Sequence, residues 1–569
     1  MKARITKYIY LMIMSTILFS CEKDLDLYPR DKFSEAVFFQ NAEQFKQFAT
    51  QFYDGLPSAS GSIGSDAGSD LMAGWSLSSV SNGSYSPSPN SGHWSGAYST
   101  IRNTTYLVQK VEEVDVELKN QVTVYIGEVR FFRAMTYFGL LKSFGGVPII
   151  DKVLDLNDEE MLYGPRATRE QVVDYILADL NAAITALPNE KDIASNDKGR
   201  VSKEAALSFK ARVALFEGTW RKFRNKDGAA LLDQAIDASN QVITGGQYEL
   251  FDRRDVLGNE SYKYFFILDK NKTNIAGLTK ADQNEYIFVN KYDIDLRAAG
   301  FPSAHGFPSV TKKFADLFLC TDGLPIEKSP LFQGRQTVLS EYENRDIRMI
   351  NILEKPYERY WANYPPEYNR NWDNQDAGGV EYQINFGNET RTGYYAHKFR
   401  PEIAPPFAPD YPVIRLAEVL LINAEAKFEK NNSITDGDLN ITINKLRERA
   451  GLAALTNAFV SSNGLDMRNE IRRERTIELF LEGFRFDDLR RWKTAEIEMP
   501  KPLRGVLWKD TQYDTDPTWG EVDFPQDGDG YIIVEPASER KFEEKHYLFP
   551  LPTRQILLNP QLKQNPGWE

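Results

Sequence analysis

Apolar residues recur at helical spacing in two separate parts of this 569-residue chain, and this pattern constrains the fold more than any other feature. The first part covers residues 41–245 and the second covers residues 409–498. The helix-length segments within them are 41–53, 94–143, 168–187, 202–224, 228–244, 411–430, 436–450 and 466–493. Helices that follow one another at such short intervals pack against their neighbours, so we expect a mostly α-helical protein.

The segment around residue 135 has the strongest apolar pattern. Its apolar residues leave almost no polar face, so this helix should be packed on several sides. They are Val129, Phe132, Met135, Tyr137, Phe138 and Leu141. The sequence from Gly145 to Pro148 ends the helix, because neither glycine nor proline sustains one. Successive helix pairs suggest a solenoid-like stack of units of about 34 residues, although the residues show no clean repeat.

Three segments interrupt the helical pattern. Residues 55–93 are dense in Ser, Gly and Pro, which predicts a long surface loop. Residues 246–408 are rich in Tyr, Trp, Asn, Pro and Gly, and residues 499–569 form an irregular C-terminal part. We therefore expect one domain over residues 41–569, in which a helical scaffold carries loop-rich insertions at 55–93 and 246–408.

The N-terminus has the pattern of an exported lipoprotein. A basic stretch at 1–7 precedes an apolar run at 8–19 that is too short to span a bilayer. LFSC at 18–21 resembles a bacterial lipobox, in which the signal is removed and the cysteine is acylated. We expect a signal peptide over 1–20, an acylated Cys21, and a lipid anchor and tether over 21–40. The remaining cysteine, Cys320, has no histidine or base nearby in sequence, which indicates a buried structural thiol.

Charge and composition exclude several classes of function. The net charge of −13 disfavours nucleic acid as a partner, because such a surface repels phosphate. The four histidines lack metal-ligand spacing, and no nucleotide-binding motif is present. We expect no cofactor, no metal centre and no catalytic residue. Asp293 and Asp295 could contribute to a calcium site, but two carboxylates do not make up the six to eight oxygens that calcium takes.

Three glutamates recur at a spacing of four in the segment 466–493. Glu474, Glu478 and Glu482 share one helix face, and paired carboxylates can hydrolyse glycosidic bonds. Arginines crowd the same segment, however, so ion pairs that tie this helix to its neighbours are the favoured interpretation. The same interpretation applies to Arg415, Glu418 and Glu425.

Six separated segments resemble the SusD/RagB family in order and spacing. They are GEVRFFRAMTYFGLLKSFGGVPII (127–150), GRVSKEAALSFKARVALFEG (199–218), VIRLAEVLLINAEAKF (413–428), INKLRERAGL (443–452), IRRERTIELFLEGFRFDDLRRWK (471–493) and YLFPLPTRQILLNPQLKQNPGW (547–568). The resemblance implies a scaffold of tetratricopeptide-like helix pairs beside an irregular region that carries the ligand site. It also implies a SusC-like TonB-dependent transporter as partner, and a lipid-anchored position on the extracellular face of the outer membrane.

The ligand that the resemblance implies is a glycan, and aromatic residues in the loops fit that ligand. A sugar ring has an apolar face that stacks on a flat aromatic side chain, while its hydroxyls bond to neighbouring amides, carboxylates or arginines. The loop after the first helix supplies ligand contacts in relatives, which favours Trp75 first and Trp372 second. The candidate ligand-binding residues are Trp75, Trp372, Trp361, Tyr85, Trp94, Asp70, Phe301, Arg370 and Asn371.

Each candidate also has a simpler interpretation. The loop aromatics could pin long loops to the scaffold, and Trp94 begins a helix in which packing is the better explanation. Other functions remain open at this stage. The protein could capture peptides, as the RagB side of the family does, it could hydrolyse glycosides at the cell surface, or it could serve only as a scaffold for partners.

Overall fold

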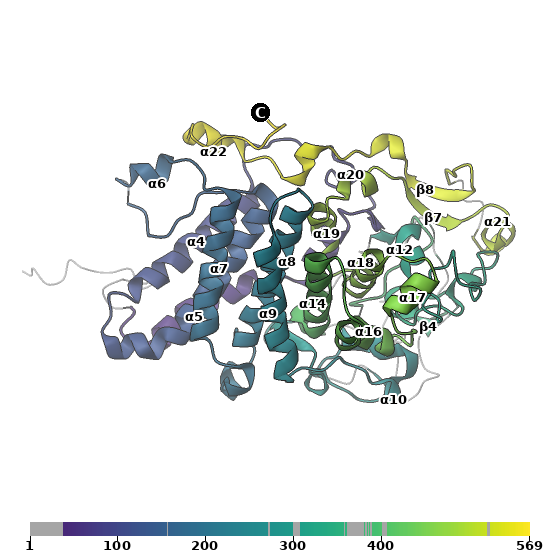
Figure 1. Cartoon of the computed structure of the whole chain (residues 1–569), viewed down its shortest axis with the longest axis horizontal. Coiled ribbons are helices and arrows are strands. Elements are labelled where there is room, and N and C mark those ends of the chain that lie inside the picture. Colours follow the sequence, from purple (N-terminus) through teal and green to yellow (C-terminus); the bar gives the residue numbers. More distant parts are fainter. Residues whose placement is uncertain are drawn as a thin grey trace, which may run out of the picture.

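The computed structural model describes residues 38–155, 157–270, 274–299, 308–357, 359–360, 380–381, 384, 386, 390–400, 407–519 and 524–569. Figure 1 shows long helices standing side by side over one half of the molecule, with short helices, loops and strand pairs over the other half. Among the described helices, none is both long enough and apolar enough to cross a membrane.

The long helices confirm the predicted mostly α-helical fold and fall close to the predicted segments. They are α2 (Ala42–Thr50), α4 (Gly92–Lys110), α5 (Val116–Phe144), α7 (Arg169–Ala186), α8 (Lys203–Lys222), α9 (Ala229–Gly245), α14 (Leu416–Asn431) and α18 (Met467–Glu478). Neighbours along the chain pack together from α4 to α9, and α14 then packs on α8, α9 and α18. A first hydrophobic core fills the space between these helices.

Helix α5 is the central element of the helical array. Its predicted apolar residues are all buried except Met135, which is half-buried, so the helix is indeed packed on several sides. Asp115 caps its N-terminus by accepting a hydrogen bond from the backbone N–H of Leu118 at 2.9 Å. Gly145 ends it with a φ of +76°, a conformation that glycine adopts most readily.

Short elements make up the rest of the described chain. The short helices are α3 (Ala59–Asp66), α6 (Glu159–Tyr163), α10 (Arg254–Leu257), α11 (Ser261–Phe265), α12 (Lys312–Leu317), α13 (Arg348–Ile352), α15 (Asp436–Ile441), α16 (Ile443–Arg449), α17 (Asn457–Ser462), α19 (Arg485–Arg491), α20 (Ala495–Glu498), α21 (Gln512–Thr515) and α22 (Thr553–Leu558). The strands form four antiparallel pairs: β1 (Met72–Ala73) with β3 (Ser309–Val310), β2 (Tyr286–Asn290) with β6 (Tyr411–Arg415), β4 (Arg359–Tyr360) with β5 (Val380–Glu381), and β7 (Leu503–Leu507) with β8 (Tyr531–Glu535). A second hydrophobic core lies under these loop-rich parts.

The segment 55–93 is not the continuous surface loop that its composition predicts. It contains helix α3 and strand β1, and residues 68–71 between them are buried. Ser58 caps α3 by accepting a hydrogen bond from the Gly61 N–H, and Ile63 enters the second core at 3% exposure. A helix built largely from Ser and Gly carries little apolar periodicity, so its sequence resembles that of a loop.

The predicted helix over 466–493 is interrupted between α18 and α19. Leu481 and Gly483 have φ values of +65° and +82°, so the chain turns there. Arg415 Nη2 donates to the Glu478 carbonyl oxygen at 2.8 Å, and Lys398 Nζ donates to the Phe480 carbonyl oxygen at 2.8 Å. These buried cations take carbonyl groups that a continuous helix would bond internally, which explains the break.

Cys320 is fully buried and forms no disulfide, as the sequence indicates.

Candidate functional site

Trp75 lies at the surface, immediately after a strand that is buried. Strand β1 pairs with β3 so that Met72 faces Val310 and Ala73 faces Ser309, and all four residues are buried. The chain then turns outward at Gly74, and the Trp75 side chain is 42% exposed. A Cβ at Gly74 would lie 2.9 Å from the Ser76 carbonyl oxygen, so this tight turn requires glycine.

Arg391 holds the turn that presents Trp75. Its Nη1 donates to the Gly74 carbonyl oxygen at 2.7 Å and its Nη2 donates to the Val534 carbonyl oxygen at 3.0 Å. Its backbone N–H donates to the Ser309 hydroxyl at 2.8 Å. Arg391 therefore joins the Trp75 turn to β8 through its side chain and to β3 through its backbone. Sequence reasoning missed this residue because these contacts join residues more than 80 positions apart.

Asp70, which was expected to contact ligand, belongs to the scaffold instead. Its carboxylate is 1% exposed and accepts two hydrogen bonds from Arg485, both at 2.8 Å, and a further bond from Lys313. Burial alone would raise the pKa of Asp70, but the Arg485 guanidinium and the Lys313 ammonium hold it well below its usual range. These ion pairs with Arg485 and Lys313 fix the chain just before β1, and they leave the Asp70 carboxylate no exposed surface for a ligand.

Tyr85 and Trp94 also pack within the protein. The Tyr85 ring lies 5.0 Å from Phe549 and 5.2 Å from Trp568, and its hydroxyl donates to the His546 carbonyl oxygen at 3.2 Å. Trp94 is 5% exposed and lies against Tyr98 and Phe144. Tyr85 thus pins its loop to the C-terminal part, and Trp94 packs as its helical spacing predicts.

The other five candidates, Trp361, Trp372, Phe301, Arg370 and Asn371, lie outside the described residues, as does Cys21. The described strands reach the ends of both segments concerned. Strand β3 begins two residues after 301–307, and β4 and β5 pair on either side of 361–379.

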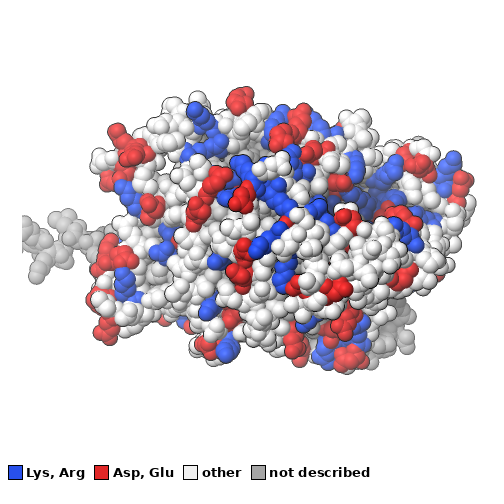
Figure 2. Space-filling view, in the orientation of Figure 1, with Lys and Arg blue, Asp and Glu red and all other residues white. Residues whose placement is uncertain are grey.

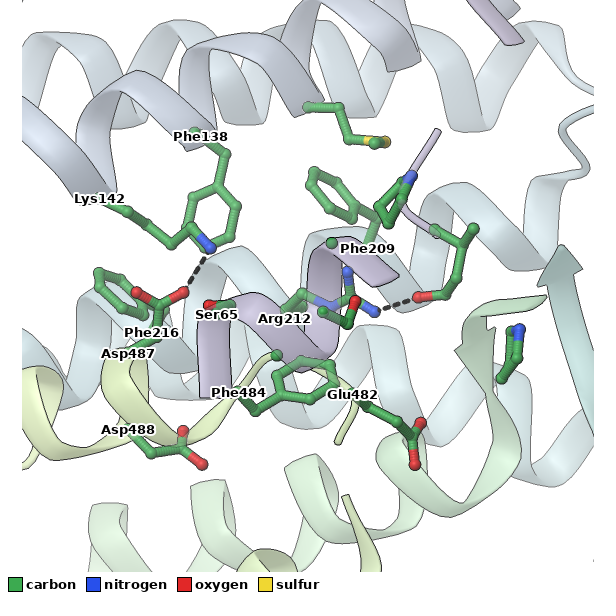
Figure 3. Close-up of a pocket in the computed structure, with 18 of the residues that line it drawn as sticks. Ser65, Phe138, Lys142, Phe209, Arg212, Phe216, Glu482, Phe484, Asp487 and Asp488 are labelled. Atoms are coloured by element: carbon green, nitrogen blue, oxygen red, sulfur yellow. Dashed lines mark hydrogen bonds and ion pairs between the residues drawn. The ribbon is translucent and has the colours of Figure 1, made fainter. Parts of the chain in front are cut away.

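A cavity of about 350 Å³ lies under helix α3, at the small end of the range of ligand pockets. Figure 3 shows Phe484 and Arg212 in its middle, with Lys142 and Asp487 paired at one end. Two guanidinium groups lie near the Phe484 ring, those of Arg212 and Arg475, each 5.2 Å from its centre. The walls come from α5, α8 and the turn before α19, which were all interpreted as scaffold, so no sequence signal marked this cavity.

The cations of the cavity already have carboxylate partners. Arg212 binds Glu418 with two contacts of 2.6 Å, and Arg475 Nε donates to Asp488 at 2.8 Å. The Arg475 Nη1 is buried without a hydrogen-bond partner among the described residues. With a volume of about 350 Å³ and walls that are partly apolar and partly ion-paired, the cavity is a small space rather than a binding surface for a polymer.

The row of glutamates is an ion-pair network, which confirms the interpretation from sequence. Glu474 accepts from Arg348 at 2.6 Å, and Arg415 binds both Glu478 and Glu482 at 2.7 Å. All five side chains are less than 10% exposed. Despite burial, the surrounding guanidinium groups hold the pKa of Glu478 well below its usual range, whereas a general acid needs a raised pKa.

Asp293 and Asp295, the pair considered for calcium, share a cation from the chain itself. Lys270 Nζ lies 2.6 Å from Asp295 and 3.4 Å from Asp293. Among the described residues no cluster of three or more potential metal ligands is present.

Comparison with known families identifies the fold. The SusD family model matches residues 267–568, which is more than half of the chain. The chain belongs to the SusD family. A second model of that family, described as starch-binding associating with outer membrane, matches residues 25–215. Carbohydrate binding and association with the outer membrane are therefore the general properties of the family to which this protein belongs.

Curated relatives match this SusD-family protein over most of their length. SusD-like protein P38 from Formosa agariphila is 23% identical over 523 residues, which cover 87% of this chain and 92% of that protein. A SusD-like protein from Bacteroides ovatus is 22% identical over 581 residues, which cover 98% of this chain and 97% of that protein.

Solved structures show the same fold. A SusD-like protein from Bacteroides fragilis has a TM-score of 0.72 at 24% identity, with 95% of this chain and all of that chain covered. A laminarin-binding SusD-like protein has a TM-score of 0.57 at 18% identity, with 93% of this chain and all of that chain covered. At these identities the likeness concerns the fold.

Proposed function

We propose that this protein is a cell-surface lipoprotein that binds oligosaccharides or polysaccharides without cleaving them and delivers them to a SusC-like TonB-dependent transporter. The observation that carries the proposal is the exposed indole of Trp75, which stands on a turn fixed by Arg391. Ordered aromatic surface costs little entropy to present, and the apolar face of a sugar ring stacks on it.

The proposed site centres on Trp75. We include in the proposal the aromatic and polar candidates that lie outside the described residues, namely Phe301, Trp361, Arg370, Asn371 and Trp372. Asp70 does not contact the ligand in this proposal, but its ion pairs with Arg485 and Lys313 hold the chain that leads to Trp75. A non-catalytic role is supported by the paired state of the glutamates in α18 and the turn that follows it. An acylated Cys21 would hold the protein on the outer face of the outer membrane, close to the transporter.

The test is binding of the chain from residue 22 onward, which keeps every described residue, to an array of immobilised glycans. We expect retention on one glycan class and a loss of affinity of up to roughly tenfold in Trp75→Ala, because one stacked ring contributes about 0.5–1.5 kcal/mol. Tyr163→Ala is the matched control, since Tyr163 is also an exposed aromatic residue, at 52%, but lies in α6.

Three results would contradict the proposal. Equal binding by Trp75→Ala and the unchanged protein would remove Trp75 from the site. Retention of peptides with no retention of any glycan would replace the ligand class. Release of shorter sugars from the array would show that the protein is a hydrolase.

A further inference from the structure

Three cations converge on one buried carboxylate where α8, α14 and α18 meet. Glu429 of α14 is 1% exposed. Its Oε2 lies 2.8 Å from Lys222 Nζ, and its Oε1 lies 2.8 Å from Arg468 Nε and 3.9 Å from Arg472 Nη2. No other carboxylate of the described residues lies within 4 Å of these three cations, so the cluster carries an excess of positive charge.

An aromatic ring lies among the same three cations. Phe223, the residue that follows α8, is half-buried. Its ring centre is 4.9 Å from the Arg472 guanidinium, 5.8 Å from that of Arg468 and 5.9 Å from Lys222 Nζ. The side chains of Lys222 and Arg468 are 25% and 32% exposed, so this group faces solvent. We refer to Lys222, Phe223, Arg468 and Arg472 as the basic platform.

Arg472 has hydrogen-bonding capacity that the described residues do not use. Its Nε and Nη2 are buried and have no hydrogen-bond partner among the described residues. Burial, together with the Arg491 and Arg468 guanidinium groups, lowers the pKa of Arg472 to about 10. The Arg472 side chain is 15% exposed, although these two nitrogens are reached from solvent only when the side chains around them move. Buried donors left without an acceptor are costly, so an acceptor that reaches them would be bound favourably.

The platform is part of a wider basic region. Figure 2 shows Lys and Arg side chains gathered in a band across the middle of one face, over α8, α19 and α18. Arg224, two residues beyond the end of α8, donates to the carbonyl oxygens of Trp220 and Arg490 and has no carboxylate of the described residues within 4 Å. On a protein whose net charge is −13, this band creates a local potential of the opposite sign.

We propose that the basic platform binds an acidic saccharide unit. The sugar ring lies on Phe223, and its sulfate or carboxylate group accepts hydrogen bonds from Arg468 and Arg472. Arginine suits both anions because its planar donors match their oxygens in pairs. The platform shares no residue with the Trp75 turn. The choice of a saccharide over other acidic ligands rests on the proposed function.

The test measures affinity for dextran sulfate, oligogalacturonate, neutral dextran and inorganic polyphosphate at about 0.15 M salt, where weak contacts between distant charges are screened. We expect one or both acidic saccharides to bind, with sulfate and carboxylate told apart by the two probes. Arg468→Ala should weaken that binding roughly tenfold, since it removes one charge-assisted contact. Phe223→Leu keeps an apolar side chain but loses the flat ring, so it should weaken binding of the acidic saccharides and leave polyphosphate binding unchanged.

Lys119→Ala is the control, because it removes one exposed positive charge from the start of α5. Thermal unfolding of each variant shows that it is folded. The proposal is overturned if neither acidic saccharide binds, if Lys119→Ala weakens binding as much as Arg468→Ala, or if Phe223→Leu leaves saccharide binding intact. If the acidic saccharides fail to bind while Trp75→Ala still weakens binding on the glycan array, the platform proposal is wrong and the Trp75 site stands. The reverse pattern would remove the Trp75 site alone.

Discussion

Asp66 and Asp70 are buried four residues apart, and their surroundings shift their pKa values in opposite directions. Asp70 faces a guanidinium and an ammonium, which keep it ionised. Asp66 accepts hydrogen bonds from the backbone N–H groups of Gly483 and Arg485, both at 3.2 Å, and burial raises its pKa to about 7. Asp70 is therefore a permanent negative charge that anchors β1, whereas Asp66 gains and loses its proton near neutral pH.

The pKa of Asp66 predicts a pH-dependent stability. The pKa of Asp66 is about 7 in the folded protein, above the ordinary value of 3.8. Between these two pH values the folded state keeps the proton and the unfolded state loses it. The stabilisation is complete below about pH 4 and is lost as pH rises through 7. Relative to Asp66→Asn, the free energy of unfolding of the unchanged protein should fall by on the order of 3 kcal/mol between pH 4 and pH 8. Urea unfolding across this range measures it, and parallel stability curves for the two proteins would contradict the assignment.

At the scale of elements, Arg415 joins parts of the chain that are far apart in sequence. It is the last residue of β6 and directly precedes α14, and its guanidinium binds Glu285 at 2.8 Å as well as Glu478 and Glu482. It therefore connects the β2–β6 pair to α18 and to the turn before α19. Charges buried in this way contribute to stability only while every partner is present.

Removal of Arg415 should destabilise the fold strongly. Arg415→Ala leaves three buried carboxylates short of a partner, and we expect the free energy of unfolding to fall by about 3–5 kcal/mol. Arg254→Ala is the control, because Arg254 is 34% exposed and pairs with Asp252 at the surface. That change should alter stability by about 1 kcal/mol or less. Chemical denaturation compares the two, and similar effects would show that the buried network is not what holds these elements together.

The sequence predicted elements whose signal is local, and it missed those that depend on distant partners. The apolar residues of α5 are dense enough to identify the helix and its burial. Helix α3 carries few apolar residues, so its composition is that of a loop. Its packing depends on Ile63, which lies in the second core. Asp70 resembled a ligand contact because Arg485, its partner, lies 415 positions away. The same limit applies to Tyr85, whose neighbours are at the C-terminal end of the chain.

At the scale of the whole molecule, the helical half and the loop-rich half have separate hydrophobic cores and perform separate tasks in our account. The first core makes the helical array rigid, and the second supports β1, β3 and the exposed Trp75. The basic platform lies where helices of the array meet, away from the Trp75 turn in the sequence.

In the proposed function, an acylated Cys21 anchors the whole molecule to the membrane. We expect Cys21→Ser to move the protein from the membrane fraction to the soluble fraction of cells, because the acyl chains supply the membrane affinity. Immunoblots of fractionated cells measure this, and glycan binding by the released protein serves as the control for folding. Persistence of the variant in the membrane fraction would show that another contact, such as a transporter, suffices to hold it.

The most direct measurement of the central claim is a crystal structure of the protein with the glycan that the array identifies. We expect a sugar ring stacked on the Trp75 indole, with Arg391 still bonded to the Gly74 carbonyl oxygen beneath it. A glycan bound elsewhere, with the Trp75 indole left open to solvent, would contradict the account.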